Sequence, residues 1–270
     1  MSYLRVNDIN IHYERCGTGE PILFIHGSGA CWKMWEPQIS AFSLNYQMIM
    51  VDIRGHGKTD RHFPQGKYSI PLIVEDIKGF ILALGLERVH IAGVSQGAVI
   101  AQMAAIRYPS LVDKLILADS YSEIPNVFWG ALLKFGTVAL RCLPIALTKR
   151  MILSAYHDQP YTRRILDKSF TIDRRTLAAL KSAQFPDHTS QLAGIQAETL
   201  VIAGGDNRVG PESESGKIIY QQIPKARLAV IHDAFDPVTV MKKDIFNQMT
   251  INFLQEKALP HYPEVTYYTK

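Results

Sequence analysis

The chain has 270 residues, 47% of them hydrophobic and 20% charged, which predicts one large domain or a domain with an insertion. Its formal net charge of +4 is small and its lysines and arginines are dispersed, so neither nucleic acid nor a membrane surface is an expected partner. The three cysteines have no metal-ligand or redox spacing and suit a reducing compartment.

No stretch of about 18 uninterrupted apolar residues occurs, and the first residues lack the charged and apolar regions of a signal peptide. We therefore expect a cytoplasmic protein that binds a small-molecule substrate or ligand, with no metal and no cofactor. The sequence does not define its oligomeric state.

Short apolar runs recur along the chain. The first residues, "MSYLRVNDINIHYE", alternate like a pair of strands, and six near-continuous apolar runs follow. Such runs are typical of strands that are covered on both faces. The six runs lie at 21–27, 46–52, 88–95, 114–120, 198–205 and 227–233.

Segments of helical spacing separate these runs. One helix is expected after the capping residue Ser69 and ends at Gly85, a second opens at Gln96 and runs to Pro109, and a third begins near Asp236. The alternation of strands and helices predicts an α/β fold with a doubly wound, mostly parallel sheet.

One segment interrupts this rhythm. Between about residues 121 and 194 the pattern is helical and apolar, with no strand-like run after the sixth strand. It is either an extra helical layer or a lid over a pocket, and we favour the lid because ligands of open α/β sheets bind outside the carboxyl ends of strands. The predicted core is then 1–120 with 195–257, and 258–270 is a peripheral tail.

The strongest motif is "GVSQG", residues 93–97, which follows a buried strand and opens a helix. In this context a G-x-S-x-G motif predicts a nucleophile elbow, in which Ser95 occupies a sharp, strained turn. Gly93 and Gly97 remove side chains that would collide around it. The alternative is an ordinary tight turn with a capping serine.

A second motif, "HGSG", follows the third strand at residues 26–29. Gly27 and Gly29 would let backbone amides approach a ligand oxygen, and the N–H groups of Ser28 and Gln96 would form an oxyanion hole. We expect His26 to orient this loop rather than to exchange protons.

These two motifs, together with "DIRGHGKTD" at 52–60 and the segment from Tyr68 into the elbow, resemble the α/β-hydrolase superfamily in its lidded form. The resemblance extends from Val6 to about Phe253 and implies the α/β-hydrolase fold. It does not define one reaction, because this fold supports many chemistries.

The resemblance implies a Ser-acid-His order along the chain, and this sequence departs from it twice. In the turn "GGDNRVGP" the position of the acid is occupied by Asn207, with Asp206 one residue early. In "DAFD", after the last expected strand, Asp236 stands where the histidine is expected. An acid without its imidazole would be a buried charge with no partner, so we interpret the two departures as one linked change that allows an Asn207–Asp236 hydrogen bond.

Other residues are candidates for the missing groups. Asp206 would serve as the acid if the turn were threaded differently, and Asp119, after the sixth strand, is another candidate. His188 would have to fold inward, and His232 is expected at the surface. His157 in the lid and His56 in the "RGHG" loop are weaker candidates.

Two functions remain open. The first is a hydrolase of a small, largely apolar ester or related carbonyl compound, with Ser95 as nucleophile or substrate anchor and Asp236 as a replacement base or water-positioning group. Because aspartate is shorter than histidine, we expect a bridging water rather than direct contact with Ser95. The second is a non-catalytic ligand-binding or regulatory protein. The retained elbow and oxyanion glycines favour the enzyme, although with weakened or altered chemistry.

Overall fold

The computed structural model describes residues 2–123, 143–182, 187–206 and 211–270. Within these residues, nine strands form one sheet in the order β1-β2-β4-β3-β5-β6-β7-β8-β9. The six strands β3 to β8 run parallel, whereas β2 and β9 pair antiparallel with their neighbours, which confirms the predicted sheet. The strands are β1 Ser2–Val6, β2 Ile9–Cys16, β3 Glu20–Ile25, β4 Tyr46–Val51, β5 Val89–Val94, β6 Val112–Ala118, β7 Glu198–Gly204, β8 Ala226–Ile231 and β9 Val265–Thr269.

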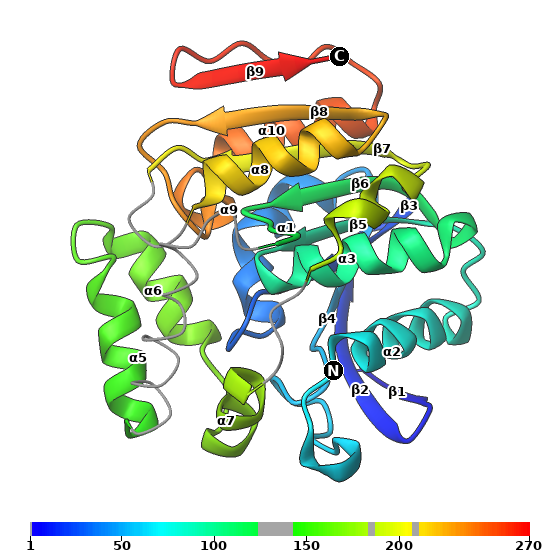
Figure 1. Cartoon of the computed structure of the whole chain (residues 1–270), viewed down its shortest axis with the longest axis vertical. Helices are drawn as coiled ribbons and strands as arrows, with labels where there is room; N and C mark the ends of the chain where they lie inside the picture. The colour runs from blue at the N-terminus through cyan, green and yellow to red at the C-terminus, as the bar shows by residue number, and fades with distance from the viewer. Residues whose placement is uncertain (1, 124–142, 183–186, 207–210) are drawn as a thin grey trace.

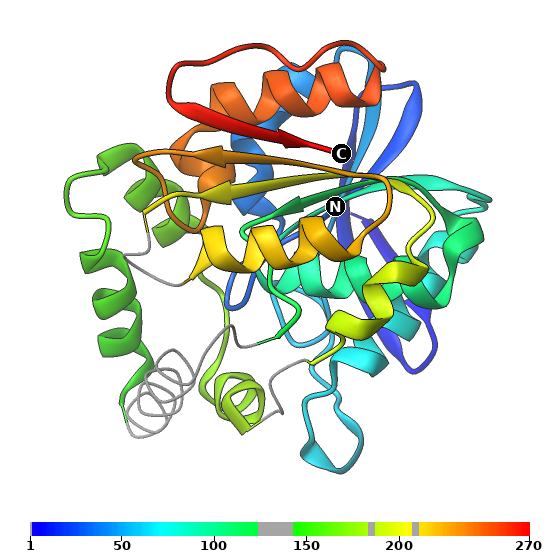
Figure 2. The same cartoon turned by 45° about the horizontal axis from the view of Figure 1, so that its top comes forward.

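Helices cover both faces of the sheet. Helices α2, α3 and α8 lie on one face, and α1 and α10 lie on the other (Figures 1 and 2). Successive residues of a strand point to opposite faces, so Leu23 and Ile25 enter one hydrophobic core while Ile22 and Phe24 enter the other. The helices are α1 Glu36–Phe42, α2 Ile70–Ala83, α3 Gln96–Arg107, α5 Ile145–Ser154, α6 Pro160–Ser169, α7 Arg174–Ser182, α8 Glu212–Gln222, α9 Val238–Met241 and α10 Lys243–Leu254.

Helices α5, α6 and α7 connect β6 to β7, where the sequence predicts a lid. Helices α5 and α6 lie beside the edge of the sheet toward which the arrows of β6 and β8 point (Figure 1). The segment after α6 contacts the core, since the backbone N–H of Thr171 donates to the carbonyl of Gly29 at 2.9 Å and its hydroxyl donates to that of Ala30 at 3.2 Å. Residues 124–142 of the predicted lid lie outside the described residues.

The structure differs from the sequence prediction at the C-terminal end. The predicted tail contains β9, which pairs antiparallel with β8 and adds an edge strand to the sheet. The single helix expected from Asp236 is divided into α9 and α10, because Lys242 has φ −120° and ψ 46° and breaks the helix. No Gly or Pro marks this break, so the hydrophobic pattern alone did not predict it.

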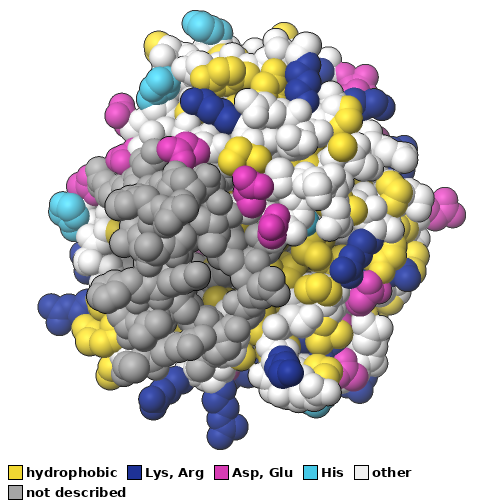
Figure 3. Space-filling model, viewed as in Figure 1, with side chains coloured by type: hydrophobic (Ala, Val, Ile, Leu, Met, Phe, Trp, Pro, Cys, Tyr) yellow, Lys and Arg dark blue, Asp and Glu magenta, His cyan; other side chains and the backbone are white. Residues whose placement is uncertain are grey.

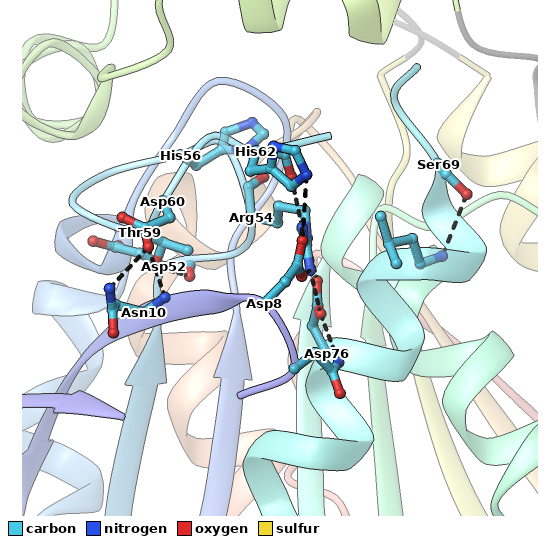
Figure 4. Close-up of polar contacts among 12 residues, drawn as sticks. Asp8, Asn10, Asp52, Arg54, His56, Thr59, Asp60, His62, Ser69 and Asp76 are labelled. Atoms are coloured by element: carbon cyan, nitrogen blue, oxygen red, sulfur yellow. Dashed lines mark hydrogen bonds and ion pairs between the residues drawn. The ribbon is translucent and has the colours of Figure 1, made fainter. Parts of the chain in front are cut away.

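The "DIRGHGKTD" loop is held by buried ion pairs (Figure 4). The guanidinium of Arg54, which is fully buried, contacts Asp76 from Nε at 2.6 Å and Asp8 from Nη2 at 2.6 Å. Asp52 accepts from His12 Nδ1 at 2.8 Å and from the backbone N–H of Trp32 at 2.7 Å. The motif therefore stabilises the loops beside the elbow by joining three parts of the chain.

Hydrophobic, basic and acidic side chains are interspersed on the face shown in Figure 3, outside the area drawn in grey. Among the described helices, none has the length and apolar character that crossing a membrane requires.

Candidate active site

Ser95 lies in a strained turn between β5 and α3. Its φ of 52° and ψ of −120° place a non-glycine residue in a rarely populated region of backbone space. A Cβ atom on Gly93 would lie 2.5 Å from the carbonyl oxygen of Gly97, and one on Gly97 would lie 2.1 Å from that of Ile25. Both positions therefore need glycine, and the turn has the geometry of a nucleophile elbow.

The "HGSG" loop approaches the elbow closely. A Cβ atom on Gly27 would lie 3.3 Å from Cβ of Ser95, and Ser28 lines the same cavity as Ser95. His26 donates from Nδ1 to the carbonyl of Gly27 at 2.8 Å, and its Nε2 accepts from the backbone N–H of Ile53 at 3.2 Å. Burial lowers the pKa of His26, so this imidazole is neutral and both of its nitrogens hold the loop.

Gln96 begins helix α3 directly after Ser95. Its backbone N–H belongs to the first turn, whose amides have no acceptor within the helix and favour negative charge nearby. Its side chain is buried, and Oε1 accepts a hydrogen bond from the hydroxyl of Tyr68 at 2.9 Å. The hydrogen bond from Tyr68 thus holds the side chain of Gln96, the first residue of α3. The backbone amide of Gln96 lies directly after Ser95.

Asp236 and Ser95 line the same cavity, and the Ser95 hydroxyl is near enough to the Asp236 carboxyl to affect its pKa. The expected bridging water stays a prediction. Burial raises the pKa of Asp236 to about 6, while the Ser95 hydroxyl acts in the opposite direction. The hydroxyl of Tyr156, just after α5, donates to the backbone carbonyl of Asp236, and its ring stacks on Phe235. Residue 236 is thereby held toward the elbow, so its short side chain lies near the serine.

A second carboxylate lies beside this pair. Asp119 follows β6 with a φ of 45° and is 2% exposed. Its Oδ1 accepts from the backbone N–H of Gly204 at 3.0 Å, and its Oδ2 accepts from that of Val238 at 2.6 Å. Burial raises the pKa of Asp119 well above its ordinary value, and the charges of Asp236 and then Glu212 raise it further.

The structure does not bring Asp206 into the same arrangement. Asp206 follows β7, and its backbone N–H donates to the carbonyl of Ala234 at 2.9 Å. Its side chain is absent from the cavity lining that the described residues form around Ser95. Asn207 lies outside the described residues, so its predicted hydrogen bond with Asp236 stays a prediction.

Ser95 and Asp236 open into a cavity of about 200 Å³ between the sheet and the lid. Its wall is largely apolar and is formed by the loop after β3 together with helices α5 and α6. Among the described lining residues Asp236 is the charged one, and none is a lysine or an arginine. These residues are Gly27, Ser28, Gly29, Ala30, Met34, Ser95, Ile152, Leu153, Tyr156, Leu166, Ser169, Phe170, Asp236 and Pro237.

None of the nine histidines, all of which lie within the described residues, is hydrogen-bonded to Ser95. His188 is buried against α3, where its Nε2 donates to Oε1 of Gln102 at 2.9 Å. His232 is exposed and pairs with the hydroxyl of Thr266 at 2.7 Å. His157 is exposed on the lid, and burial lowers the pKa of His56 to about 3 in the loop after β4.

The comparisons with known proteins agree with this fold. Residues 20–136 match the family model described as the alpha/beta hydrolase fold. A 2-hydroxy-6-oxononadienedioate/2-hydroxy-6-oxononatrienedioate hydrolase of Pseudomonas putida is 30% identical over 92% of this chain and 92% of its own length. The putative carbamate hydrolase RutD of Azorhizobium caulinodans is 26% identical over 95% of this chain and 99% of its own. The chain belongs to the α/β-hydrolase family, and these relatives are named as hydrolases.

Solved structures show the same architecture. A hydrolase from Pseudomonas aeruginosa superposes with a TM-score of 0.81 at 26% identity, covering 94% of this chain and 97% of its own. A thermophilic esterase from Thermogutta terrifontis superposes with a TM-score of 0.82 at 22% identity, covering 95% and 99%, and supports the fold alone.

Proposed function

We propose that this protein hydrolyses a small, largely apolar ester or a related carbonyl compound, with Ser95 as nucleophile and Asp236 as the base. The observation that supports this most directly is the placement of Ser95 and Asp236 in the lining of one cavity, with the Ser95 hydroxyl near enough to lower the pKa of the Asp236 carboxyl. Serine is a poor nucleophile unless a neighbouring group takes its proton, and Asp236 is the group in position to do so.

In the proposed reaction, Ser95 Oγ attacks the carbonyl carbon as its proton passes to Asp236. The backbone N–H groups of Ser28 and Gln96 hold the oxyanion that forms. When the intermediate collapses, the bond to the leaving alkoxide breaks and the alcohol takes the proton from Asp236. Water then attacks the acyl-serine as Asp236 takes its proton. The bond to Ser95 Oγ breaks, the carboxylic acid leaves, and Asp236 returns the proton to Ser95.

The raised pKa makes Asp236 more suitable for this role. A carboxylate with a pKa of about 6 is a stronger base than an ordinary aspartate and is still mostly ionised at neutral pH. It is nevertheless shorter and less adaptable than an imidazole. Loss of an effective general base typically costs a factor on the order of 100 to 10,000, so we expect slow turnover.

The cavity indicates a neutral substrate. Its described lining is mostly apolar and includes one carboxylate but no lysine or arginine, so an anionic group would be both unpaired and repelled. The Pseudomonas putida relative is named for dienedioate substrates, which have two carboxylates. We therefore propose an uncharged acyl group for this chain.

The proposal is tested by steady-state hydrolysis of p-nitrophenyl acetate and butyrate at pH 7.5. The wild type should exceed the rate of Ser95→Ala at least 100-fold, the lower end of what a positioned nucleophile and base provide. Equal rates for the folded wild type and the variant would contradict a serine mechanism.

The lack of an imidazole at Ser95 favours a second candidate, a non-catalytic protein that binds a small apolar carbonyl ligand in the same cavity. In that case butyramide and esters of butyric acid would bind, detected by calorimetry, without being hydrolysed. Under either function, the double variant Asn207→Asp, Asp236→His should gain esterase activity, because it restores both residues of the family pattern.

A further inference from the structure

Asp119 is a buried carboxylate that the proposed reaction does not use. It is 2% exposed and has a φ of 45°, a conformation that is unfavourable for a residue with a side chain. A buried charge and a strained backbone both cost free energy, so the contacts of this side chain must offset that cost.

Those contacts join the ends of three secondary-structure elements near the elbow: the end of β6, the end of β7 and the start of α9. One Asp119 oxygen accepts from the backbone N–H of Gly204, the last residue of β7, at 3.0 Å. The other accepts from Val238, the first residue of α9, at 2.6 Å. Val238 lies two residues after Asp236, so the Asp119 carboxylate fixes the turn that presents Asp236 to Ser95.

The groups facing Asp119 are acidic or phenolic. Asp236 and Glu212 act on it through their charges, and the hydroxyls of Tyr121 and Tyr156 lie in the same buried environment. Two buried carboxyls that repel each other are not both readily ionised, and such a pair titrates as a unit. The backbone N–H groups on both Asp119 oxygens act against the increase in its pKa but do not reverse it.

We propose that Asp119 is the positioning acid for residue 236: its carboxyl oxygens accept from the backbone N–H groups of Gly204 and Val238 and so tie the turn of Asp236 to β7. The role that the family resemblance places at position 207, after β7, is then filled from β6. This inference rests on the proposed function only where it concerns Asp236 as a base. The placement of Asp119 beside residue 236 is independent of turnover.

The test replaces Asp236 by histidine, which would put an imidazole between Ser95 and Asp119. We expect Asp236→His alone to hydrolyse p-nitrophenyl butyrate at least about 100-fold faster than the wild type. Adding Asp119→Asn should remove most of that gain. Asp206 is the nearest competing acid in the sequence, so Asp206→Asn is the matched change. Adding it should preserve the gain in activity, because the proposal gives the role of acid to Asp119.

If Asp206→Asn removes the gain and Asp119→Asn does not, the acid is Asp206 and the proposal is wrong. In Asp119→Asn, the side-chain NH2 group would face one of the two backbone N–H donors, and this repulsion can unfold the turn. A second measurement therefore uses Asp236→His by itself. An NMR titration should give the added imidazole a pKa above the ordinary 6.5, since a neighbouring carboxylate favours its charged form. A value below 6.5 would overturn the proposal. This readout needs no catalysis, so an inert wild type refutes the proposed function but leaves this inference standing.

Discussion

At the scale of single residues, the site depends on the side chain at position 236. In the proposed arrangement, an imidazole there would give the family's Ser-His-acid order, whereas Asp236 places a carboxyl with a raised pKa near the serine. The side chain lies near Ser95 because its backbone is held on two sides, by Tyr156 at its own carbonyl and by Asp119 at Val238. Under the proposed function, Asp236 therefore changes the base while the geometry of the elbow is retained.

The raised pKa of Asp236 predicts a pH-dependent cost in stability. The folded state binds this proton more tightly than the unfolded state, so the contribution of Asp236 is most favourable below pH 4 and is lost as pH rises toward 6. We expect Asp236→Asn to gain stability relative to the wild type between pH 4 and pH 8, by at most about 3 kcal/mol. Urea denaturation at both pH values measures this, and a difference that is independent of pH would contradict the assignment.

Arg54 gives a residue-scale prediction that does not involve the site. Removing its guanidinium in Arg54→Met leaves Asp76 buried without its cation, which should lower the free energy of unfolding by about 3–5 kcal/mol. The double variant Arg54→Met, Asp76→Leu should cost less than the single one, because no buried charge is then left unpaired, the side chain of Asp8 being 44% exposed. A double variant that is less stable than the single one, in chemical denaturation, would show that the pair itself is strongly stabilising.

At the scale of elements, helix α5 and the turn after β8 meet at the site. The contact consists of the Tyr156 hydroxyl on the carbonyl of Asp236 and of its ring on Phe235, so the segment at the end of α5 also holds the proposed base. The segment after α6 is bound to the loop of the proposed oxyanion hole through Thr171. The lid and the catalytic turns are consequently coupled through a few hydrogen bonds.

We expect Tyr156→Phe to weaken this coupling. Loss of the hydroxyl should lower the free energy of unfolding by about 1 kcal/mol and raise KM, because the ring still packs but the carbonyl of Asp236 loses its donor. Tyr161→Phe is the matched control, since Tyr161 is an exposed lid tyrosine, 37% accessible. Urea denaturation and ester kinetics of both variants check this, and equal effects of the two changes would count against the contact.

The elements and the elbow were predictable because their signals are local. Continuous apolar runs indicated strands β3 to β8, and glycine spacing around Ser95 indicated the elbow. Strand β9 was missed because it is short and pairs only at the edge, although "VTYYT" has strong strand-forming residues. The contact of Asp119 with Val238 was not predictable, since it joins residues far apart in the sequence and depends on how two turns pack.

At the scale of the whole molecule, two cores on either side of one sheet place the carboxyl ends of β3, β5, β6, β7 and β8 near a common edge. The loops after these strands provide the proposed oxyanion hole, Ser95, Asp119, Asp206 and Asp236, in that order. The family fold therefore supplies every position of a hydrolase site. We propose that this chain is distinguished by the chemistry at two of those positions, 207 and 236.

The most direct test of that chemistry is the rate at which a fluorophosphonate labels Ser95, followed by intact-mass spectrometry from pH 5 to pH 9. A carboxylate base predicts slow labelling that rises through about pH 6, requires Ser95 and falls at least 100-fold in Asp236→Asn. Labelling that is as fast in Asp236→Asn as in the wild type would show that another group activates Ser95.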